Sequence, residues 1–159
     1  MRRALAIAAL LVSGVACGSG SSGDAAASLT DKLVSHPVRV VSGDSLDLAG
    51  GQQVVVIAFV AQWCVPCRTE LPMMQTLAQK HQDVRFVAVG VNEEPDVTAG
   101  FLHQIGVTFE SGADPQGQLY ADLGFTSLPG TLVLNSDLTQ KQRFPGRVNE
   151  AELESALSS

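Results

Sequence analysis

Hydrophobic residues form a continuous run from Val54 to Val60, and such a run predicts a β-strand that is covered on both faces. The segment that follows contains Trp63-Cys64-Val65-Pro66-Cys67, and apolar residues then return with the period of an α-helix. The helical positions are Leu71, Met74, Leu77 and Ala78. We therefore expect a central strand that leads into a cysteine-containing loop and then into a helix.

A second apolar run, from Val84 to Val91, predicts another buried strand. Because a helix separates the two runs, the strands are expected to pair in parallel through a βαβ connection. Upstream, Leu33–Val41 and Ser45–Leu48 flank the turn residues Ser42-Gly43-Asp44, which predicts a leading hairpin or a pair of edge strands.

The remainder of the chain alternates helix and strand patterns. Residues 93–106 form a weaker helical pattern, followed by a short apolar strand at 107–109. Asp114-Pro115 is expected to start a helix that continues to Leu123 and ends at Gly124. The last expected elements are a strand at 131–135, a turn at Ser136-Asp137, a strand at 141–144, and a helix from Asn149 that buries Leu153 and Leu157. This order predicts one α/β domain with a central mixed sheet flanked by helices.

Cys64 and Cys67 are spaced for a redox-active disulfide. Two residues between them at a helix start let both sulfurs meet on the first turn, with the Cα atoms about 5.5 Å apart. The positive end of the helix dipole favours a thiolate, so the pKa of Cys64 is expected below its ordinary value of about 8.5. Cys64 is therefore the predicted attacking sulfur.

The N-terminal residues have the layout of an export signal. Arg2 and Arg3 precede an apolar run, Ala4–Val12, which is too short to span a membrane as a helix of ~20 residues. The run ends in Ser13-Gly14-Val15-Ala16-Cys17, which resembles a bacterial lipobox with glycine in place of the usual leucine. An ordinary secretory signal with an incidental cysteine and a chance apolar start are the alternatives.

These features predict three parts along the chain. Residues 1–16 form a signal peptide, and residues 17–33 contain the lipidated Cys17 and a linker whose Gly, Ser and Ala residues at 18–27 predict a flexible tether. The folded domain then occupies residues 34–159. With Cys17 carrying lipid, the three cysteines of the chain resolve into one anchor and one redox pair. The formal net charge of −6 argues against binding nucleic acid.

The extended motif W-C-x-P-C-R-x-E-x-P runs from Trp63 to Pro72, and a second matching element follows at Leu128-Pro129. With these motifs, the stretch 34–157 resembles the thioredoxin superfamily, and within it the TlpA/ResA-like extracytoplasmic thiol-disulfide oxidoreductases. The resemblance implies a thioredoxin-like fold with an inserted αβ unit between the redox helix and the strand that follows Pro129.

The resemblance also implies roles for single residues. Pro129 would follow a cis peptide bond beside the cysteine pair, and Leu128 and Trp63 would contact the substrate. Thioredoxins place a buried acid on the strand before the first cysteine, where this chain has Ala58. Glu70 matches the glutamate that ResA-like proteins keep, so it is the expected proton carrier for Cys67. A solvated helix glutamate is the alternative for Glu70, and Arg68 is expected to be a solvated partner on the helix surface.

The implied function is exchange of disulfides with exported proteins outside the cytoplasmic membrane. The resemblance favours a reductant of the cytochrome c maturation type that receives electrons from a membrane partner, with the cysteine pair as the only cofactor. A disulfide-forming oxidant and an inert adaptor of the same fold remain alternatives. So does a copper-binding module, although such proteins typically space their cysteines by three and add a histidine.

Two further site classes fit the residues less well. A structural zinc site needs four ligands, and beyond the cysteine pair the domain offers only three scattered histidines, so no metal is expected. A peroxidatic enzyme would need a single low-pKa cysteine in a different context. The histidines are His36, His81 and His103.

The lipobox interpretation predicts that Cys17→Ser will abolish lipid attachment, because the thiol is the only acceptor of the diacylglycerol group. Incorporation of a labelled fatty acid should be seen for the wild-type chain and lost in the variant, which should accumulate as an unprocessed precursor. A wild-type protein that never takes up the label would contradict the anchor.

Overall fold

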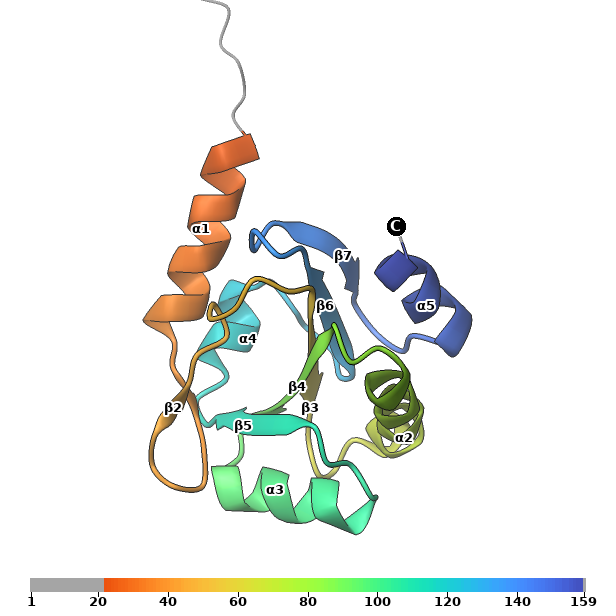
Figure 1. Ribbon diagram of the computed structural model, residues 1–159. Coiled ribbons are helices and arrows are strands. Elements are labelled where there is room, and N and C mark those ends of the chain that lie inside the picture. Colours follow the sequence, from red (N-terminus) through yellow and green to blue (C-terminus); the bar gives the residue numbers. More distant parts are fainter. Residues whose placement is uncertain (1–21, 159) are drawn as a thin grey trace, which may run out of the picture.

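The structure, a computed structural model, describes residues 22–158, with side chains described from residue 29 onward. Its strands form one seven-stranded sheet in the order β2-β1-β5-β4-β3-β6-β7. Figure 1 shows this sheet with helices on both faces. The elements are α1 (Ser22–Ser35), β1 (Val38–Arg39), β2 (Ser45–Leu46), β3 (Val55–Val60), α2 (Val65–Lys80), β4 (Arg85–Val91), α3 (Pro95–Gln104), β5 (Glu110–Asp114), α4 (Gln118–Asp122), β6 (Gly130–Leu134), β7 (Gln140–Phe144) and α5 (Glu150–Ser158).

Strand β3 lies in the interior of the sheet, between β4 and β6, as its unbroken apolar sequence predicts. All six of its residues are buried, and it pairs in parallel with β4 and antiparallel with β6. The parallel pair is joined by α2, so the predicted βαβ unit is confirmed. The predicted pairing of β1 with β2 and of β6 with β7 is also confirmed, and both pairs are antiparallel.

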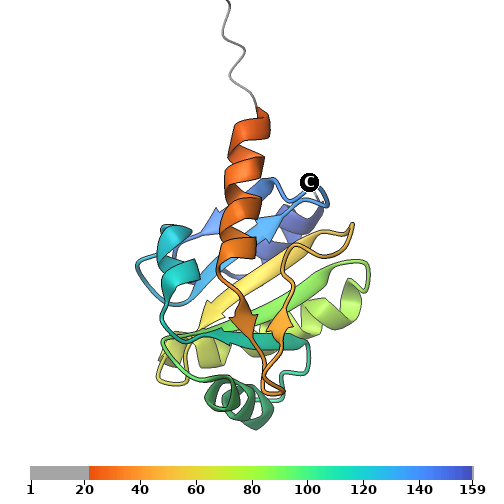
Figure 2. The same cartoon turned by 90° about the vertical axis from the view of Figure 1, so that its left-hand side faces the viewer.

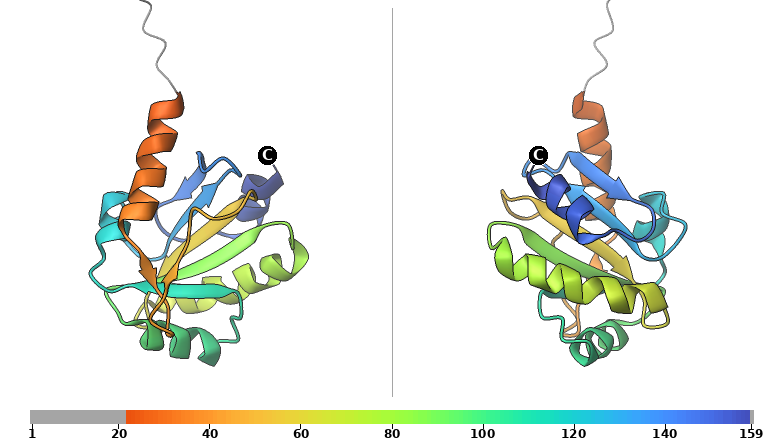
Figure 3. Two further views of the ribbon diagram at one scale, coloured as in Figure 1. Left: turned by 60° about the vertical axis from the view of Figure 1, so that its left-hand side comes forward. Right: turned by 90° about the vertical axis from the view of Figure 1, so that its right-hand side faces the viewer.

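Successive residues of β3 point to opposite faces of the sheet and divide the core into two clusters. Val56, Ala58 and Val60 face the cluster that contains the buried side chains of α2, α3 and α5. Val55, Ile57 and Phe59 face the cluster that α1 and α4 complete. Figure 2 shows α1 and α4 in front of one face, and the right-hand view of Figure 3 shows α2 and α5 over the other. The cysteine pair belongs to the first cluster.

The predicted position of the strand at 107–109 is wrong, because the strand begins three residues later, at Glu110. Strand β5 lies at Glu110–Asp114, where it pairs in parallel with β4 and touches β1. Val107 is buried and Phe109 half-buried, so the apolar run fills the core from a loop. Gly112 explains why a polar, glycine-containing segment forms the strand: a Cβ at this position would lie 2.5 Å from Val38 Cγ1, so only glycine lets β1 approach.

The helix expected after Asp114-Pro115 is shorter than predicted. Asp114 ends β5 and is buried, and its carboxylate accepts hydrogen bonds from the backbone N–H groups of Gln118 and Tyr120. It therefore caps α4 from the preceding strand, and Gly117 takes the position before the helix with a positive φ of 65°. Gly124 follows the helix with φ +74°, as its predicted role requires.

Helix α1 occupies residues 22–35, so it corrects the expected flexible tether from residue 22 to 27 and the linker up to residue 33, whereas residues 18–21 lie outside the described part of the chain. Leu33 is buried in the second cluster and Leu29 packs against it. The Lys32 ammonium donates to the Asp122 carbonyl at 2.8 Å, and His36 Nε2 lies 2.7 Å from the Asp122 carboxylate. These contacts attach the end of α1 to α4. The predicted signal peptide and Cys17 lie outside the described residues, and no helix within 22–158 is long and apolar enough to cross a membrane.

Helix α5 begins at Glu150, directly after the predicted starting residue Asn149, and has a reciprocal cap. The Glu152 N–H donates to the Asn149 side chain at 3.0 Å, and the Asn149 N–H donates to the Glu152 carboxylate at 2.9 Å. Leu153 is fully buried and Leu157 packs against the same cluster, so both face inward as expected. The cap fixes the chain just after Val148, whose backbone contributes to the site described next.

Candidate active site

The cysteine pair lies where β3 ends and α2 begins. Cys64 and Cys67 form a disulfide with a Cα–Cα distance of 5.3 Å. Cys64 is the residue before the first helical turn, and the Cys67 N–H donates both to the Cys64 carbonyl at 3.1 Å and to its sulfur at 3.3 Å. The first sulfur therefore sits at the helix N-terminus among backbone N–H groups, which is the setting that favours a thiolate.

Exposed apolar side chains flank a buried disulfide. Cys64 is 3% exposed and Cys67 is 0% exposed, whereas Trp63 and Val65 are 70% and 73% exposed. Apolar groups that are exposed next to one another, unlike single exposed ones, are typical of a surface that binds a partner. The arrangement places an apolar rim around Cys64, which fits the predicted contact between Trp63 and a substrate.

The Leu128-Pro129 peptide bond is cis, as the resemblance implied. Gly130 lies opposite Phe59 in the antiparallel pairing of β6 with β3, so Pro129 stands beside the end of β3 from which the redox loop departs. Pro129 is buried, and Leu128 is half-buried against both core clusters. Leu128 and Pro129 thus lie at the same end of β3 as the cysteines. The contact of Leu128 with a substrate stays a prediction.

Gly130 accommodates an aromatic ring. A Cβ at this position would lie 2.7 Å from Phe125 Cδ1, so the ring occupies the space that a side chain would need. Phe125 is itself buried, stacks on Tyr120 at a centroid distance of 5.7 Å, and carries the Arg143 guanidinium 3.9 Å from its ring centre. The aromatic packing therefore requires glycine directly after Pro129.

Glu70 belongs to the redox helix α2, and its side chain is buried. The alternative that Glu70 is a solvated glutamate on the helix surface is therefore wrong. Glu70 is 5% exposed, and its carboxylate accepts a hydrogen bond of 3.0 Å from the Val148 N–H. Loss of solvent raises the pKa of Glu70 from 4.5 to about 7, against the lowering effects of that hydrogen bond and of the positive charge on Arg147. The carboxyl can therefore hold or release a proton near neutral pH, as a general acid or base must. Its catalytic role remains a prediction.

Thr131 and Ala58 complete the surroundings of this carboxyl. They lie opposite each other on β6 and β3, and Ala58 belongs to the first core cluster. The Thr131 hydroxyl acts to lower the pKa of Glu70, yet among the described buried side chains it is the one polar group without a hydrogen bond of good geometry. Position 58 carries no ionisable group, so the buried acid of this site comes from α2 and not from β3.

The structure places Arg68 on the exposed surface of α2, as expected, and adds a residue that the sequence did not indicate. Arg68 is exposed, but its guanidinium donates to the Gln62 carbonyl at 3.0 Å and lies 4.8 Å from the centre of the Phe101 ring. The Glu93 carboxylate accepts the Gln62 N–H at 3.0 Å. Both contacts reach the backbone just before Trp63. No sequence motif marks Glu93, because a bond to a distant backbone N–H leaves no residue pattern.

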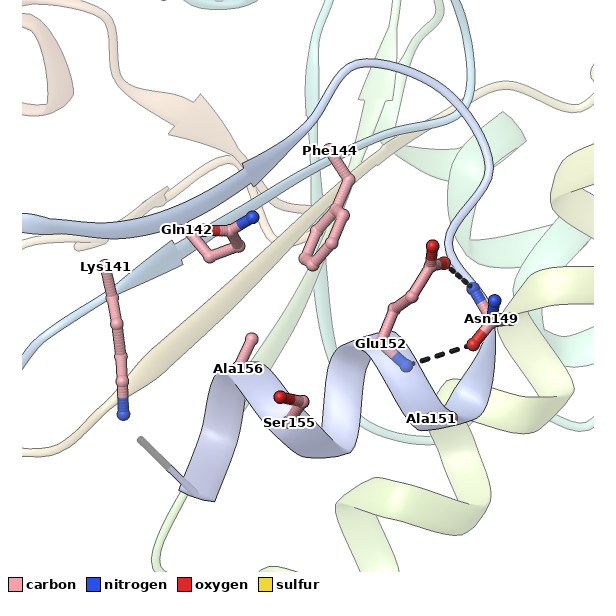
Figure 4. Close-up of a pocket in the computed structure, with 8 residues that line it drawn as sticks. All are labelled: Lys141, Gln142, Phe144, Asn149, Ala151, Glu152, Ser155 and Ala156. Atoms are coloured by element: carbon pink, nitrogen blue, oxygen red, sulfur yellow. Dashed lines mark hydrogen bonds between the residues drawn. The ribbon is translucent and has the colours of Figure 1, made fainter.

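Other parts of the described chain offer no comparable chemistry. Within residues 22–158, no three His, Cys, Asp or Glu side chains gather as they would around a metal ion. An open groove of about 600 Å³ lies between β7 and α5, where Phe144 and Glu152 contribute to its walls (Figure 4). None of the residues that line this groove belongs to the redox motif.

Comparison with known proteins agrees with this geometry. The model of the AhpC/TSA family matches residues 27–141. The thiol:disulfide interchange protein HelX of Rhodobacter capsulatus is 30% identical over 105 residues, which cover 65% of this chain and 58% of that protein. The thiol-disulfide oxidoreductase ResA of Geobacillus kaustophilus is 31% identical over 107 residues, or 66% of this chain and 62% of the relative. The chain therefore spans about three fifths of the length of these relatives.

A solved structure supports the fold. A secreted Mycobacterium tuberculosis disulfide oxidoreductase homologous to E. coli DsbE superposes with a TM-score of 0.69, over 83% of this chain and 97% of that one, at 18% identity. This likeness confirms the thioredoxin-like arrangement of a mixed sheet with flanking helices. The chain therefore belongs to the AhpC/TSA family, with a thioredoxin-like fold and a C-x-x-C disulfide, and it is similar to thiol-disulfide oxidoreductases of the HelX and ResA type.

Proposed function

We propose that this protein is a thiol-disulfide oxidoreductase that acts outside the cytoplasmic membrane. The observation that carries the proposal is the pairing of a C-x-x-C disulfide at the N-terminus of α2 with a buried carboxyl, Glu70, whose pKa is about 7. A structural disulfide needs neither the helix terminus nor a nearby proton carrier. Both features serve sulfur exchange, in which a thiolate attacks and a second thiol must lose its proton.

The reaction of the reduced pair has two steps. The Cys64 thiolate attacks one sulfur of a substrate disulfide, forms a mixed disulfide and releases the other substrate sulfur as a thiolate. Cys67 then attacks the Cys64 sulfur, and the substrate's remaining sulfur leaves. The substrate gains two electrons and the pair loses two, so a dithiol donor must reduce the pair before another cycle. The cysteines are the only cofactor in this scheme.

Glu70 supplies the proton transfer of the second step. Cys67 is fully buried, and a buried thiol resists ionisation because its thiolate is not solvated. A neighbouring carboxylate that accepts the thiol proton removes this obstacle, and the desolvation that raises the pKa of Glu70 brings it close to neutral pH. In the reverse reaction the protonated carboxyl returns the proton to the leaving Cys67 thiolate.

The relatives support thiol-disulfide exchange as the activity. HelX and CycY are named as thiol:disulfide interchange proteins and ResA as a thiol-disulfide oxidoreductase. We extend this activity to the present chain, with exported proteins as substrates, reduction of apocytochrome c as the favoured task, and a membrane protein as the electron donor. A lipid on Cys17 would hold the domain at the membrane surface near that donor.

A reductant of this kind should have a low reduction potential. Equilibration of the purified domain with dithiothreitol buffers is expected to give a value near that of thioredoxin, about −270 mV, and a difference of about 30 mV corresponds to a factor of ten in the equilibrium. A value near −120 mV, that of a strong oxidant, would reverse the proposed direction of electron flow while leaving the exchange chemistry intact.

The two-step scheme predicts that the cysteine variants differ. Cys67→Ser retains the attacking sulfur without its resolving partner, so it should accumulate mixed disulfides with substrate proteins. Cys64→Ser should trap few, since its remaining thiol is buried. Electrophoresis without reductant measures both, and equal trapping by the two variants would contradict the assignment of Cys64 as nucleophile.

Glu70→Gln should slow the Cys67 step about tenfold or more near pH 7 and remove its dependence on a group with a pKa of about 7. Stopped-flow measurement of mixed-disulfide resolution across pH tests this. Glu94, directly before α3, provides a matched control, because Glu94→Gln alters a carboxylate that is 61% exposed. A wild-type pH profile in Glu70→Gln would remove the proton-transfer role.

The same variant has a signature in stability. Because burial raises the folded-state pKa of Glu70 from 4.5 to about 7, the folded protein keeps a proton in this window that the unfolded chain releases. Stability of the wild type should therefore fall as pH rises from about 4.5 to 7, by on the order of 3 kcal/mol at most. Glu70→Gln should lack this decline in denaturant titrations.

A further inference from the structure

The redox loop begins with a turn at residues 61–64, and the packing of side chains in the core does not fix the conformation of its tip. Ala61 and Cys64 close the turn through a hydrogen bond of 3.0 Å from the Cys64 N–H to the Ala61 carbonyl. The two residues at its tip, Gln62 and Trp63, are both exposed. Apolar burial therefore contributes little at the tip, and other contacts must fix the direction in which Trp63 leaves the backbone.

Glu93 holds one side of this turn. Its Oε2 accepts the Gln62 N–H at 3.0 Å, and its Oε1 accepts the hydroxyl of Thr98 at 2.9 Å. Thr98 is fully buried on α3, so the carboxylate is itself fixed in place. Gly90 permits this arrangement, because a Cβ there would lie 1.8 Å from the Thr98 hydroxyl. A hydrogen bond to a carboxylate is stronger than one between neutral groups.

Arg68 holds the other side. Its guanidinium donates to the Gln62 carbonyl at 3.0 Å and, over a longer distance of 3.5 Å, to the side chain of Gln104. It also lies over the buried ring of Phe101, at 4.8 Å from the ring centre. Phe101 and Gln104 both belong to α3. The Glu93 carboxylate thus binds the N–H of Gln62, and the Arg68 guanidinium binds its C=O, so the two peptide units on either side of Gln62 are both held.

We propose that Glu93 and Arg68 are positioning residues, which fix the Ala61–Cys64 turn and so present Trp63 to protein substrates. This inference rests on the proposed function and extends it. Their supports, Thr98, Phe101 and Gln104, all lie on α3, so the αβ unit inserted after β4 acts as the scaffold of the substrate-contacting rim. Neither side chain is placed to react with sulfur; each acts on the backbone of the turn.

The test uses Trp63, which is the chain's only tryptophan, so intrinsic fluorescence reports on this residue alone. In Glu93→Ala and Arg68→Ala, time-resolved anisotropy should show at least a twofold larger amplitude of fast local motion. Glu93→Gln should behave like the wild type, because a carboxamide can accept the Gln62 N–H and donate to the Thr98 hydroxyl. Glu94→Ala, which removes a neighbouring carboxylate that makes no such contact, is the matched control.

Kinetics with two substrates provide the second readout. With the disulfides of insulin as the protein substrate, Glu93→Ala and Arg68→Ala should raise KM at least fivefold and change kcat less than twofold. The variants would impair the docking of the substrate but not the sulfur chemistry. With oxidised glutathione, which is too small to need the Trp63 rim, the variants should react within twofold of the wild type. Thermal unfolding by circular dichroism separates these effects from a general loss of structure.

The outcomes are distinct. Wild-type anisotropy and KM in both alanine variants would overturn the proposal. So would equal losses with both substrates, since these would indicate a damaged fold or sulfur site. If Glu93→Ala does not fold because the buried Thr98 hydroxyl loses its acceptor, the exposed Arg68→Ala decides the matter. A wild-type protein without any exchange activity would refute the proposed function, whereas the anisotropy comparison would still decide whether the two residues fix the turn.

Discussion

The parallel pairing of β3 with β4 is the constraint from which the site follows. Two adjacent parallel strands need a crossover, and here the crossover is α2, whose first turn therefore stands at the carboxyl end of β3. The chain must leave a buried strand and enter a helix within four residues, and Cys64 occupies the position before that helix. The order of the strands thus places the Cys64 sulfur at the N-terminus of α2. The core that packs against α2 buries the Cys67 sulfur.

Burial then sets the electrostatics of the site. Glu70 lies one helical turn after Cys67 on α2, and the water lost when its side chain is buried raises the pKa of this carboxyl to about 7. The Val148 N–H partly compensates by donating a hydrogen bond to this carboxylate, and it is held there because α5 begins two residues later. Packing of the last helix against α2 consequently helps to set the pKa of Glu70, the proposed proton carrier of the redox pair.

The sequence indicated the parts of the fold whose stability comes from long apolar runs. The unbroken run of β3 and the helical period of α2 were sufficient for the βαβ unit and the cysteine pair, and the cis bond before Pro129 followed from family resemblance. Strand β5 was misplaced because its segment, Glu110–Asp114, is polar and pairs through its backbone. Helix α1 was missed because its composition matches a tether, and its docking depends on Asp122, far along the chain.

Gly130 also limits which amino-acid substitutions the site can accept during evolution. Any side chain at this position would collide with the ring of Phe125, which is in contact with Tyr120, Phe59 and Arg143. A larger residue at 130 is therefore compatible with the fold only when a smaller one replaces Phe125. The two positions form a coupled pair, so homologues should exchange them together, and motif transplants between such proteins will fail when they copy the proline loop without the aromatic residue behind it.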